Sequence, residues 1–374
     1  MLTEHISIEL ILFFILYGIT GFVPFVAAIY LLLRRGNVFA PDVTPPVQLR
    51  RWAASFFAVS ALSHVWWLLI YIFSRDIYSV EYLAAIMLDC MALFTTFAGT
   101  LLTMLQDRRR SVWPVFVAMI PLLPLGALLT IEPDGPFMVI TSIYILLLYV
   151  LFSVYMVFAV RQYGRWLNDN YADLENKKVW LSQTVSLAFL LLFILYALVD
   201  TETTILTYVL HFVQLALFCL LLWRVETLPE LADTIAAEET CATSAQEPTQ
   251  PSTVNGQLFN LPSNIEQQLA EHCVDTKLYL QHDLTLQQLA QAIGTNRSYL
   301  SQYFSRQGIT YNTYINNLRI NHFINSYQEA ATAGQPIVAQ QLASESGYRS
   351  YSTFSLAFKQ RMGQSVTAWM HDAD

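Results

Sequence analysis

The sequence predicts an all-α protein in two parts, a bundle of seven membrane-spanning helices followed by a soluble helical domain. Three observations predict this architecture. Of the 374 residues, 55% are hydrophobic and only 13% are charged, whereas soluble domains contain about 25% charged residues. The shortage of charge is confined to the first two-thirds of the chain. Beyond residue 258, apolar residues recur at helical spacing between polar ones, as in a soluble helical domain.

Seven apolar runs approach or exceed the roughly 20 residues that a helix needs to cross a hydrocarbon core of about 30 Å. No basic residue precedes the first run, and it is too long for the apolar part of a signal peptide, so we expect it to be retained. Prolines are expected to kink the first and fourth helices, at Pro24 and at Pro114, Pro121 and Pro124. The runs lie near residues 8–33, 53–73, 82–105, 112–131, 137–160, 179–199 and 203–223.

The loops between the runs predict the orientation of the chain. Basic residues gather in alternate loops, whereas the N-terminus and the opposite loops are acidic and hold a single arginine, Arg75. Basic loops face the cytoplasm, so an odd number of spans places the N-terminus outside and the C-terminal domain inside. The outer loops are short, so we expect no external sensor domain. The basic residues are Arg34, Arg35, Arg50, Arg51, Arg108, Arg109, Arg110, Arg161, Arg165, Lys177, Lys178 and Arg224.

The composition predicts three segments. Residues 1–224 form the seven-span domain, residues 225–257 form a polar linker rich in Thr, Glu, Pro and Ser, and residues 258–374 form the soluble domain. A linker of this composition is flexible and would hold a small domain clear of the lipid headgroups. The soluble domain is expected to open near Ser263, followed by a stripe of Ile265, Leu269 and Cys273.

The soluble domain contains a first helix, glycine turn and second helix between residues 285 and 306. An apolar stripe from Leu286 to Ile293 follows a possible capping box of Thr285 and Gln288. Gly294 would make the turn, and Asn296 is a good cap for a second helix of sequence RSYLSQYFSR.

The same arrangement recurs about 54 residues later. The segment VAQQLASES predicts a helix, Gly347 a turn, and Ser350 the cap of a second helix that ends at Gly363. A long helix with Ile320 and Phe323 on its apolar stripe connects the two arrangements. Helix, turn and helix form the helix-turn-helix unit, whose second helix can enter the major groove of DNA.

These residues resemble the DNA-binding domain of the AraC/XylS family of bacterial transcription regulators, which carries two helix-turn-helix units on a connecting helix. The resemblance covers roughly residues 262–370. Val366 replaces a proline of the family signature, and Trp369 and Met370 replace its aromatic–arginine pair. The matching residues are Ala343, Gly347, Tyr348, Ser350, Ser352, Phe354, Phe358, Lys359, Gly363 and Ser365, with Leu289, Ala290, Leu300, Phe304, Gly308, Tyr314, Ile315, Arg319 and Ile320 in the first unit.

Exposed side chains in the first half of each second helix are expected to read base edges, and basic residues to bind phosphates. Gln302 could pair with adenine and Leu356 could meet a thymine methyl; the serines could equally be plain surface or capping residues. The candidate DNA-binding residues are Asn296, Arg297, Ser298, Ser301, Gln302, Arg306, Arg349, Ser350, Tyr351, Ser352, Ser355, Leu356 and Lys359.

The soluble domain has little positive charge for a DNA-binding domain. Residues 258–374 contain seven Lys and Arg against eight Asp and Glu, whereas DNA-binding domains carry a basic face. We therefore expect weak non-specific affinity for DNA. Pairing of two chains in a homodimer, through the membrane bundle, would compensate by raising the effective concentration.

Three ionisable residues lie deep in apolar runs: His64, Asp89 and His211. Counting 1.5 Å per residue from the helix ends places them at one level of the bilayer. Such residues suggest function because they are costly in lipid. They could form a ligand-sensing pocket, make interhelical hydrogen bonds that only fix packing, or bind a metal ion together; our prediction names no metal site and no cofactor.

The sequence therefore predicts a non-enzymatic, multi-pass protein of the bacterial inner (cytoplasmic) membrane with a cytoplasmic DNA-binding domain. Its partners would be double-stranded DNA, the lipid bilayer, a second copy of the chain, and an unknown small ligand or membrane protein that carries the stimulus. The alternatives are a transporter or membrane enzyme with a regulatory tail, and a C-terminal domain that docks proteins instead of DNA. Metalloprotease HExxH, esterase GxSxG and phosphate-binding glycine motifs are all missing from the sequence.

Overall fold

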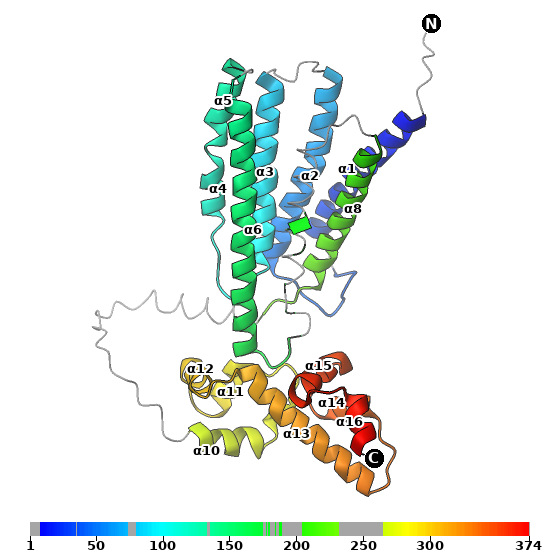
Figure 1. Ribbon diagram of the computed structural model, residues 1–374, viewed down its shortest axis with the longest axis vertical. Coiled ribbons are helices and arrows are strands. Elements are labelled where there is room, and N and C mark those ends of the chain that lie inside the picture. The colour runs from blue at the N-terminus through cyan, green and yellow to red at the C-terminus, as the bar shows by residue number, and fades with distance from the viewer. Residues whose placement is uncertain are drawn as a thin grey trace, which may run out of the picture. The chain divides into compact units, whose positions relative to one another are not determined.

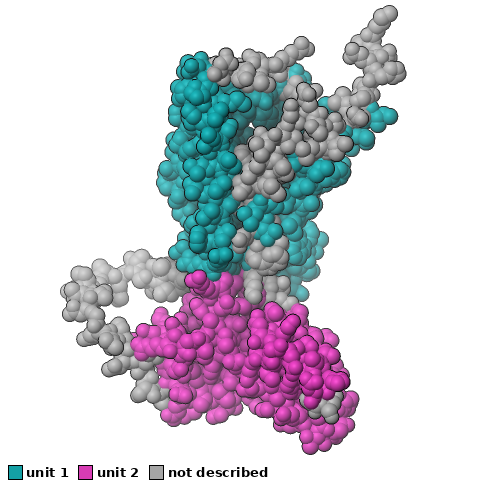
Figure 2. Space-filling model, in the orientation of Figure 1, with its two compact units in different colours: residues 1–163, 179–232 teal, residues 164–178, 233–374 magenta. Residues whose placement is uncertain are grey.

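The computed structural model describes residues 8–34, 36–73, 80–132, 135–174, 177, 179, 184, 187–188, 204–231 and 265–373. The chain divides into two compact units (Figure 2): residues 1–163 with 179–232, and residues 164–178 with 233–374. Apart from one isolated β-bridge, all regular secondary structure in the described ranges is helical, so the all-α prediction is confirmed. The predicted linker lies mostly outside the described residues.

Long apolar helices form the first unit (Figure 1). Helix α1 packs against α2 and α8, and α2 packs against α3. Phe94 of α3 contacts Tyr149 and Phe152 of α6, with ring centroids 4.5 and 5.4 Å apart. The helices are α1 (Ile8–Leu33), α2 (Val47–Phe73), α3 (Val80–Thr103), α4 (Trp113–Met119), α5 (Leu122–Ile131), α6 (Phe137–Asn170) and α8 (Thr204–Thr227).

Six segments among the described residues are long and apolar enough to cross a membrane. They agree with six of the seven predicted spans, and the remaining prediction, near residues 179–199, lies largely outside the described residues. Large apolar side chains on these helices are exposed, including Phe22, Leu62 and Phe158 at 63%, 65% and 64%. An exposed apolar surface of this extent is typical of helices that contact lipid.

Prolines divide the fourth predicted span into two helices. Helices α4 and α5 are separated by Ile120 and Pro121, because proline lacks a backbone N–H and its ring clashes with the preceding turn. Pro114 lies at the start of α4 and Pro124 in the first turn of α5, where the missing donor does not matter. Helix α1 continues through Pro24.

Loops that follow different helices meet at one end of the first unit. Arg34, just after α1, forms a buried ion pair with Glu226 of α8 at 2.9 Å. Gln106, after α3, donates from Nε2 to the carbonyl of Pro229, beyond α8, at 2.9 Å. Arg108 donates to Gln162 Oε1 of α6 at 3.2 Å. The ends of α1, α3 and α8 and this turn of α6 therefore lie together.

Short helices surround one long helix in the second unit. The long helix, α13 (Tyr311–Thr332), contributes Ile315 to a first buried cluster and Ile320 and Phe323 to a second. Each cluster is the core of one helix-turn-helix arrangement. The other elements are α10 (Ile265–Leu269), the π-helix η1 (Ala270–Val274), the 3-10 helix η2 (Leu278–Leu280), α11 (Leu286–Ala292), α12 (Arg297–Arg306), α14 (Ala339–Glu345), α15 (Tyr351–Met362) and α16 (Val366–Ala373).

The helix ends in this unit are set by local side chains, as predicted. Thr285 and Gln288 form the capping box of α11, each side chain accepting the other residue's backbone N–H. The side chains of Asn296 and Ser350 accept first-turn N–H groups of α12 and α15. Gly363 ends α15 at a φ of 76°, in the left-handed region.

A buried arginine joins the two helix-turn-helix arrangements. Arg319, in the middle of α13, is 1% exposed and donates to the carbonyls of Tyr279 and Gln281, both at 2.7 Å. Its guanidinium lies over the ring of Tyr348, 5.5 Å from the centroid. Burial lowers the pKa of Arg319, and the two carbonyls replace the water that solvates an exposed guanidinium.

Substitution of Gly347 by alanine is expected to destabilise the second unit far more than substitution of Gly334. Both glycines have positive φ, 88° and 64°, which costs a non-glycine residue about 1 kcal/mol. A Cβ on Gly347 would also lie 2.7 Å from the carbonyl oxygen of Leu280, whereas one on Gly334 meets nothing within 4 Å. We expect a total of about 3 kcal/mol for Gly347→Ala.

Limited proteolysis of the full chain in membranes, over a temperature series, would measure this difference. Similar midpoints for release of the C-terminal fragment from the two variants would show that the Leu280 contact does not constrain the turn.

Candidate nucleic-acid interface and membrane cavity

Helix α12 presents the residues predicted to read bases in the first arrangement. Its inward face is buried in the first cluster. Ser298, Ser301 and Gln302 are exposed on the outward face. Arg306, in the last turn, is also exposed and makes no hydrogen bond or ion pair with any residue that the structure describes. This face therefore offers hydroxyl, amide and guanidinium donors to a groove.

Helix α15 presents a different set in the second arrangement. Ser352 and Lys359 are exposed, and Tyr351 and Ser355 are half-buried. Leu356 is 54% exposed, so its apolar side chain is available to a partner. Thymine methyl groups are apolar contacts of the kind that such a side chain can meet in a major groove.

Most positive charge in the second unit is engaged within the protein. Arg319 is buried, Arg361 donates to an asparagine and a carbonyl of α13, and Arg349 pairs with Asp283 at 2.6 Å. Arg306 and Lys359 are the cations of α12 and α15 without such a contact among the described residues. The second unit has few cations by sequence, and fewer still on the recognition helices are free to contact DNA.

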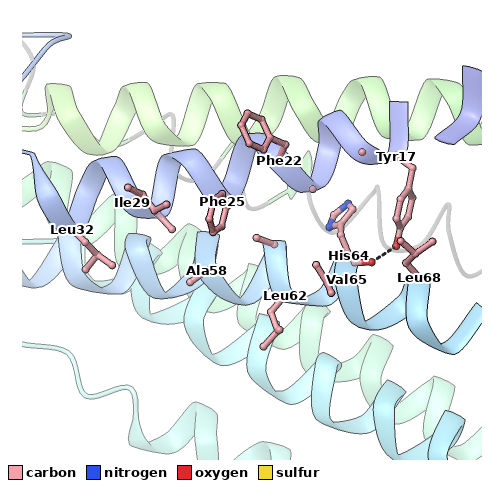
Figure 3. Close-up of a pocket in the computed structure, with 14 residues that line it drawn as sticks. Tyr17, Phe22, Phe25, Ile29, Leu32, Ala58, Leu62, His64, Val65 and Leu68 are labelled. Carbon is pink, nitrogen blue, oxygen red and sulfur yellow. Dashed lines mark hydrogen bonds between the residues drawn. The ribbon is translucent and has the colours of Figure 1, made fainter. Parts of the chain in front are cut away.

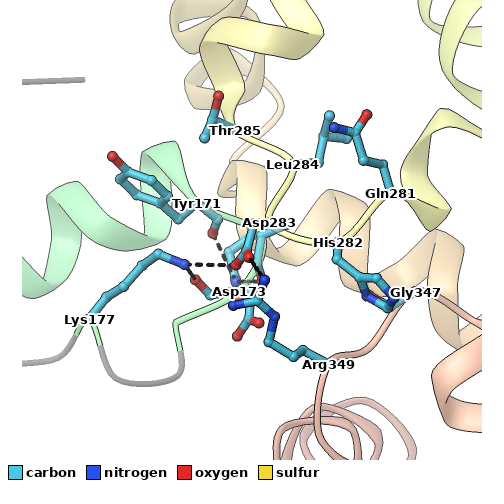
Figure 4. Close-up of polar contacts among 12 residues, drawn as sticks. Tyr171, Asp173, Lys177, Gln281, His282, Asp283, Leu284, Thr285, Gly347 and Arg349 are labelled. Carbon is cyan, nitrogen blue, oxygen red and sulfur yellow. Dashed lines mark hydrogen bonds and ion pairs between the residues drawn. The ribbon is translucent and has the colours of Figure 1, made fainter. Parts of the chain in front are cut away.

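The chain that follows α6 packs into the second unit, beside the first helix-turn-helix arrangement (Figure 4). We call residues 170–174 and 177 the docked segment. Tyr171 and Ala172 are 3% and 2% exposed, and Ala172 belongs to the first buried cluster. Tyr171 forms an antiparallel bridge with Thr285, and the N–H of Ala172 donates to the carbonyl of Leu284 at 3.3 Å.

Side chains of the second unit hold the docked segment by its polar groups. Asn312 of α13 donates from Nδ2 to the carbonyls of Tyr171 and Ala172, at 3.1 and 2.7 Å. Arg297, the first residue of α12, donates from Nε to Asn170 Oδ1 at 2.9 Å. A residue predicted to contact DNA is therefore bonded to the docked segment.

Asp283 links the docked segment to the second helix-turn-helix arrangement. Its φ of 54° lies in the left-handed region, which is uncommon outside glycine but enriched in aspartate. Its carboxylate pairs with Lys177 at 3.1 Å through Oδ1 and with Arg349 at 2.6 Å through Oδ2. Arg349 directly precedes the N-cap of α15. One carboxylate thus binds both the docked segment and the turn before a recognition helix.

The three deep ionisable residues line one cavity in the first unit. The cavity has a volume of about 510 Å³, and its walls come from α1, α2, α3, α6 and α8. The ring of Tyr17 contacts the imidazoles of both His64 and His211, with centroids 5.1 and 6.0 Å apart. The structure thus brings His64, Asp89 and His211 around a single space.

Asp89 is held by neighbours on α2. Ser63 and Trp67 both donate to its Oδ2, at 2.8 and 2.9 Å. These bonds join α2 to α3, as an interpretation based on packing alone would require. Among the described residues, no group of three or more His, Cys, Asp or Glu side chains could hold a metal ion.

An apolar groove between α1 and α2 adjoins this cavity (Figure 3). Its volume is about 600 Å³, and Tyr17 and His64 line both spaces. The Tyr17 hydroxyl donates to the carbonyl of His64 at 2.7 Å. Phe25 and Leu62 belong to its walls and are exposed. Tyr17 and His64 therefore lie between the cavity and the groove.

The sequence analysis missed the docked segment. Residues 164–178 lie between two apolar runs and were assigned to a connecting loop. The local signal is weak, because Tyr171 and Ala172 are two of several apolar residues in this stretch, with Trp166, Leu167 and Leu174. The partners Asn312 and Asp283 are more than a hundred residues away, so no sequence spacing could have indicated the contact.

Comparison with known families supports the assignment of the second unit. Residues 289–372 match the profile of the helix-turn-helix domain family, and this stretch extends from α11 into α16, including both recognition helices. The C-terminal part of the chain is an AraC-type helix-turn-helix DNA-binding domain, joined in one chain to six candidate membrane helices. No curated protein and no solved structure matches the chain at a significant level.

Replacing Lys359 by glutamine is expected to weaken binding to any DNA duplex and to reduce its salt dependence. Each phosphate contact contributes about 0.9 to the slope of log K against log salt, so the slope should fall by about 1. Lys277→Gln is the matched control, because Lys277 lies on neither recognition helix.

Fluorescence anisotropy of a labelled mixed-sequence duplex, titrated with the full chain in nanodiscs at several salt concentrations, measures both slopes. Equal slopes for the Lys359 variant and the unchanged chain would remove Lys359 from the interface.

Proposed function

We propose that the chain is a membrane-anchored, sequence-specific DNA-binding regulator of transcription that couples a membrane or extracytoplasmic stimulus to gene expression. The observation that carries this proposal is the presence, in one chain, of two capped recognition helices with exposed polar faces and six candidate membrane helices. The regulator acts by binding and not by catalysis.

A seven-span topology, with the DNA-binding unit in the cytoplasm of a bacterium, is part of the proposal. The contacts of Arg108 with Gln162 and of Gln106 with Pro229, both from the chain just after α3, group the C-terminal end of α8 with the late turns of α6. Two helices that end on the same side require an even number of crossings, counting the later one and those between. Helix α8 is one of these crossings, so a second is required between α6 and α8. The apolar run near residues 179–199 lies in that interval, which supports seven spans in all. The charge of the loops supports a cytoplasmic side.

The docked segment is the proposed route of coupling. It continues directly from α6, whose residues up to Tyr163 belong to the apolar unit. It bonds the start of α12 through Arg297 and the turn before α15 through Asp283. A displacement of α6 would thus change the restraints on both recognition helices at once. Ligands that favour one arrangement of the bundle would shift the population of DNA-binding geometries.

Homodimerisation is the third part of the proposal. Two helix-turn-helix arrangements with few unengaged cations give one chain a small electrostatic contribution to binding. Two chains held together in a membrane would bind adjacent half-sites with a raised effective concentration. The preferred sites would be direct or inverted repeats spaced by whole turns of the double helix.

Genome-wide mapping of DNA cross-linked to the full chain tests the function. We expect enrichment of a small number of sites with a shared sequence, lost when residues 258–374 are deleted. A transporter with a regulatory tail would instead keep its transport activity after this deletion and enrich no sequence. Enrichment that survives the deletion would contradict the proposal.

Asn312→Ala is expected to release the docked segment and to weaken the response of target genes to the stimulus. The variant loses two hydrogen bonds to main-chain carbonyls, worth about 2 kcal/mol together. Cleavage by trypsin after Lys177 in membrane vesicles should then become faster, on the order of tenfold. Asn317→Ala is the matched control, since this neighbour on α13 makes no side-chain hydrogen bond with the described residues.

The rate of cleavage and the response of target genes are measured together. Faster cleavage together with an unchanged response of target genes would exclude the docked segment as the coupling route. Unchanged cleavage would show that Asn312 does not hold the segment in solution.

A further inference from the structure

We propose that the cavity around Asp89 is a binding site for a small organic cation, an ammonium group attached to an apolar, preferably aromatic, body. This inference deepens the proposed function by naming the class of ligand that would serve as the stimulus. It is carried by the donors and acceptors that line the cavity, by the carboxylate, and by the aromatic walls.

Four hydrogen-bond donors of the cavity wall, on Tyr17, Ser60, Ser63 and Trp67, are directed to protein acceptors. The hydroxyl of Tyr17 donates to the carbonyl of His64, and that of Ser60 to the carbonyl of Phe56 at 2.8 Å. Ser63 and Trp67 donate to Asp89 Oδ2, as described above. A carboxylate or a phosphate would have to break these bonds to use those four donors.

Asp89 and His64 each offer the cavity an acceptor. Both donors to Asp89 reach Oδ2, and Oδ1 receives no hydrogen bond from any residue that the structure describes. His64 Nδ1 lies 2.8 Å from the carbonyl of Ser60. A carbonyl can only accept, so Nδ1 carries the proton and Nε2 of the neutral ring is an acceptor. An ammonium group provides up to three N–H donors for acceptors of this kind.

The charge of the cavity wall also favours a cationic ligand. Asp89 carries the formal negative charge of the cavity wall, in a region where an uncompensated charge is costly. Two neutral donors lessen that cost without neutralising the carboxylate. A cationic ligand would neutralise it, and this provides a reason for a carboxylate at this depth that packing alone does not.

The walls suit an organic cation better than a bare ion. The cavity volume of about 510 Å³ lies within the range of small-molecule sites, roughly 300–1,000 Å³. Aromatic rings face ammonium groups favourably, and six of the fifteen residues that line the cavity are aromatic. The aromatic lining residues are Tyr17, Phe56, Trp67, Phe97, Tyr149 and Phe218. A metal ion would leave most of this space unfilled and, in the described residues, lacks a set of three ligands.

The adjoining groove offers such a ligand a way in. Tyr17 and His64 separate the cavity from the groove between α1 and α2, so rotation of these side chains would connect the two. An amine with an apolar body partitions into the bilayer interface and could enter from there.

Binding of 2-phenylethylamine to the full chain in nanodiscs tests the proposal, with 2-phenylethanol and phenylacetate as neutral and anionic probes of similar size. We expect the amine to bind and raise the thermal midpoint of the first unit, and the other two probes to bind at least tenfold more weakly. Asp89→Asn keeps the acceptors for Ser63 and Trp67 but removes the charge, and should weaken amine binding by at least tenfold. Asp42→Asn removes the same charge from an exposed loop and should have no effect.

Calorimetry on the same samples reports the affinities without any DNA present, so failure here is distinct from failure of the DNA-mapping experiment. Equal binding of the three probes, preferential binding of phenylacetate, or amine binding that survives Asp89→Asn would each overturn the proposal. If Asp89→Asn fails to fold, Phe97→Leu provides the second test, because loss of an aromatic wall should weaken the amine more than the alcohol.

Discussion

The buried guanidinium of Arg319 is the interaction on which the DNA-binding unit depends. It fixes the chain around Tyr279 and Gln281 against the middle of α13, and it contacts Tyr348 of the second arrangement. The ion pair of Asp283 with Arg349 and the contact of His282 Nδ1 with the carbonyl of Gly347, at 3.1 Å, also link the two arrangements. An arginine suits this place because its planar group can donate to two carbonyls and pack against a ring at the same time.

The loop that Arg319 fixes leads directly to Asp283, and this determines what the docked segment can do. Since the loop is held at Gln281, the carboxylate of Asp283 has a defined position from which to bind Lys177 and Arg349. A contact with the chain after α6 is therefore connected through rigid structure to both recognition helices. The proposed coupling of the membrane helices to the DNA-binding unit requires packed elements with two discrete arrangements. A flexible tether alone would not transmit it.

Local structure was predictable from the sequence to the extent that it depends on neighbouring residues. The capping box at Thr285 and the cap at Ser350 are short-range hydrogen bonds, and the apolar stripes of the soluble helices follow from a period of 3.6 residues. The contact of Arg297 with Asn170 was not predictable, because it joins residues 127 positions apart with no repeating pattern between them. The grouping of His64 with Asp89 was accessible only because helices in a bilayer share a common depth axis.

In the proposed mechanism, the low positive charge of the second unit gives the docked segment more influence on DNA binding than a comparable contact would have in a basic domain. Salt-dependent affinity for DNA grows with the number of phosphates that cations neutralise. With Arg319 buried and Arg349 paired, each remaining cation on a recognition helix is a large share of the total. Arg297 is bonded to the neutral side chain of Asn170 in the docked arrangement, so in the proposed mechanism undocking would free its guanidinium at the N-terminal end of α12, where recognition helices contact bases and phosphates. A domain with abundant positive charge would register such a change only weakly.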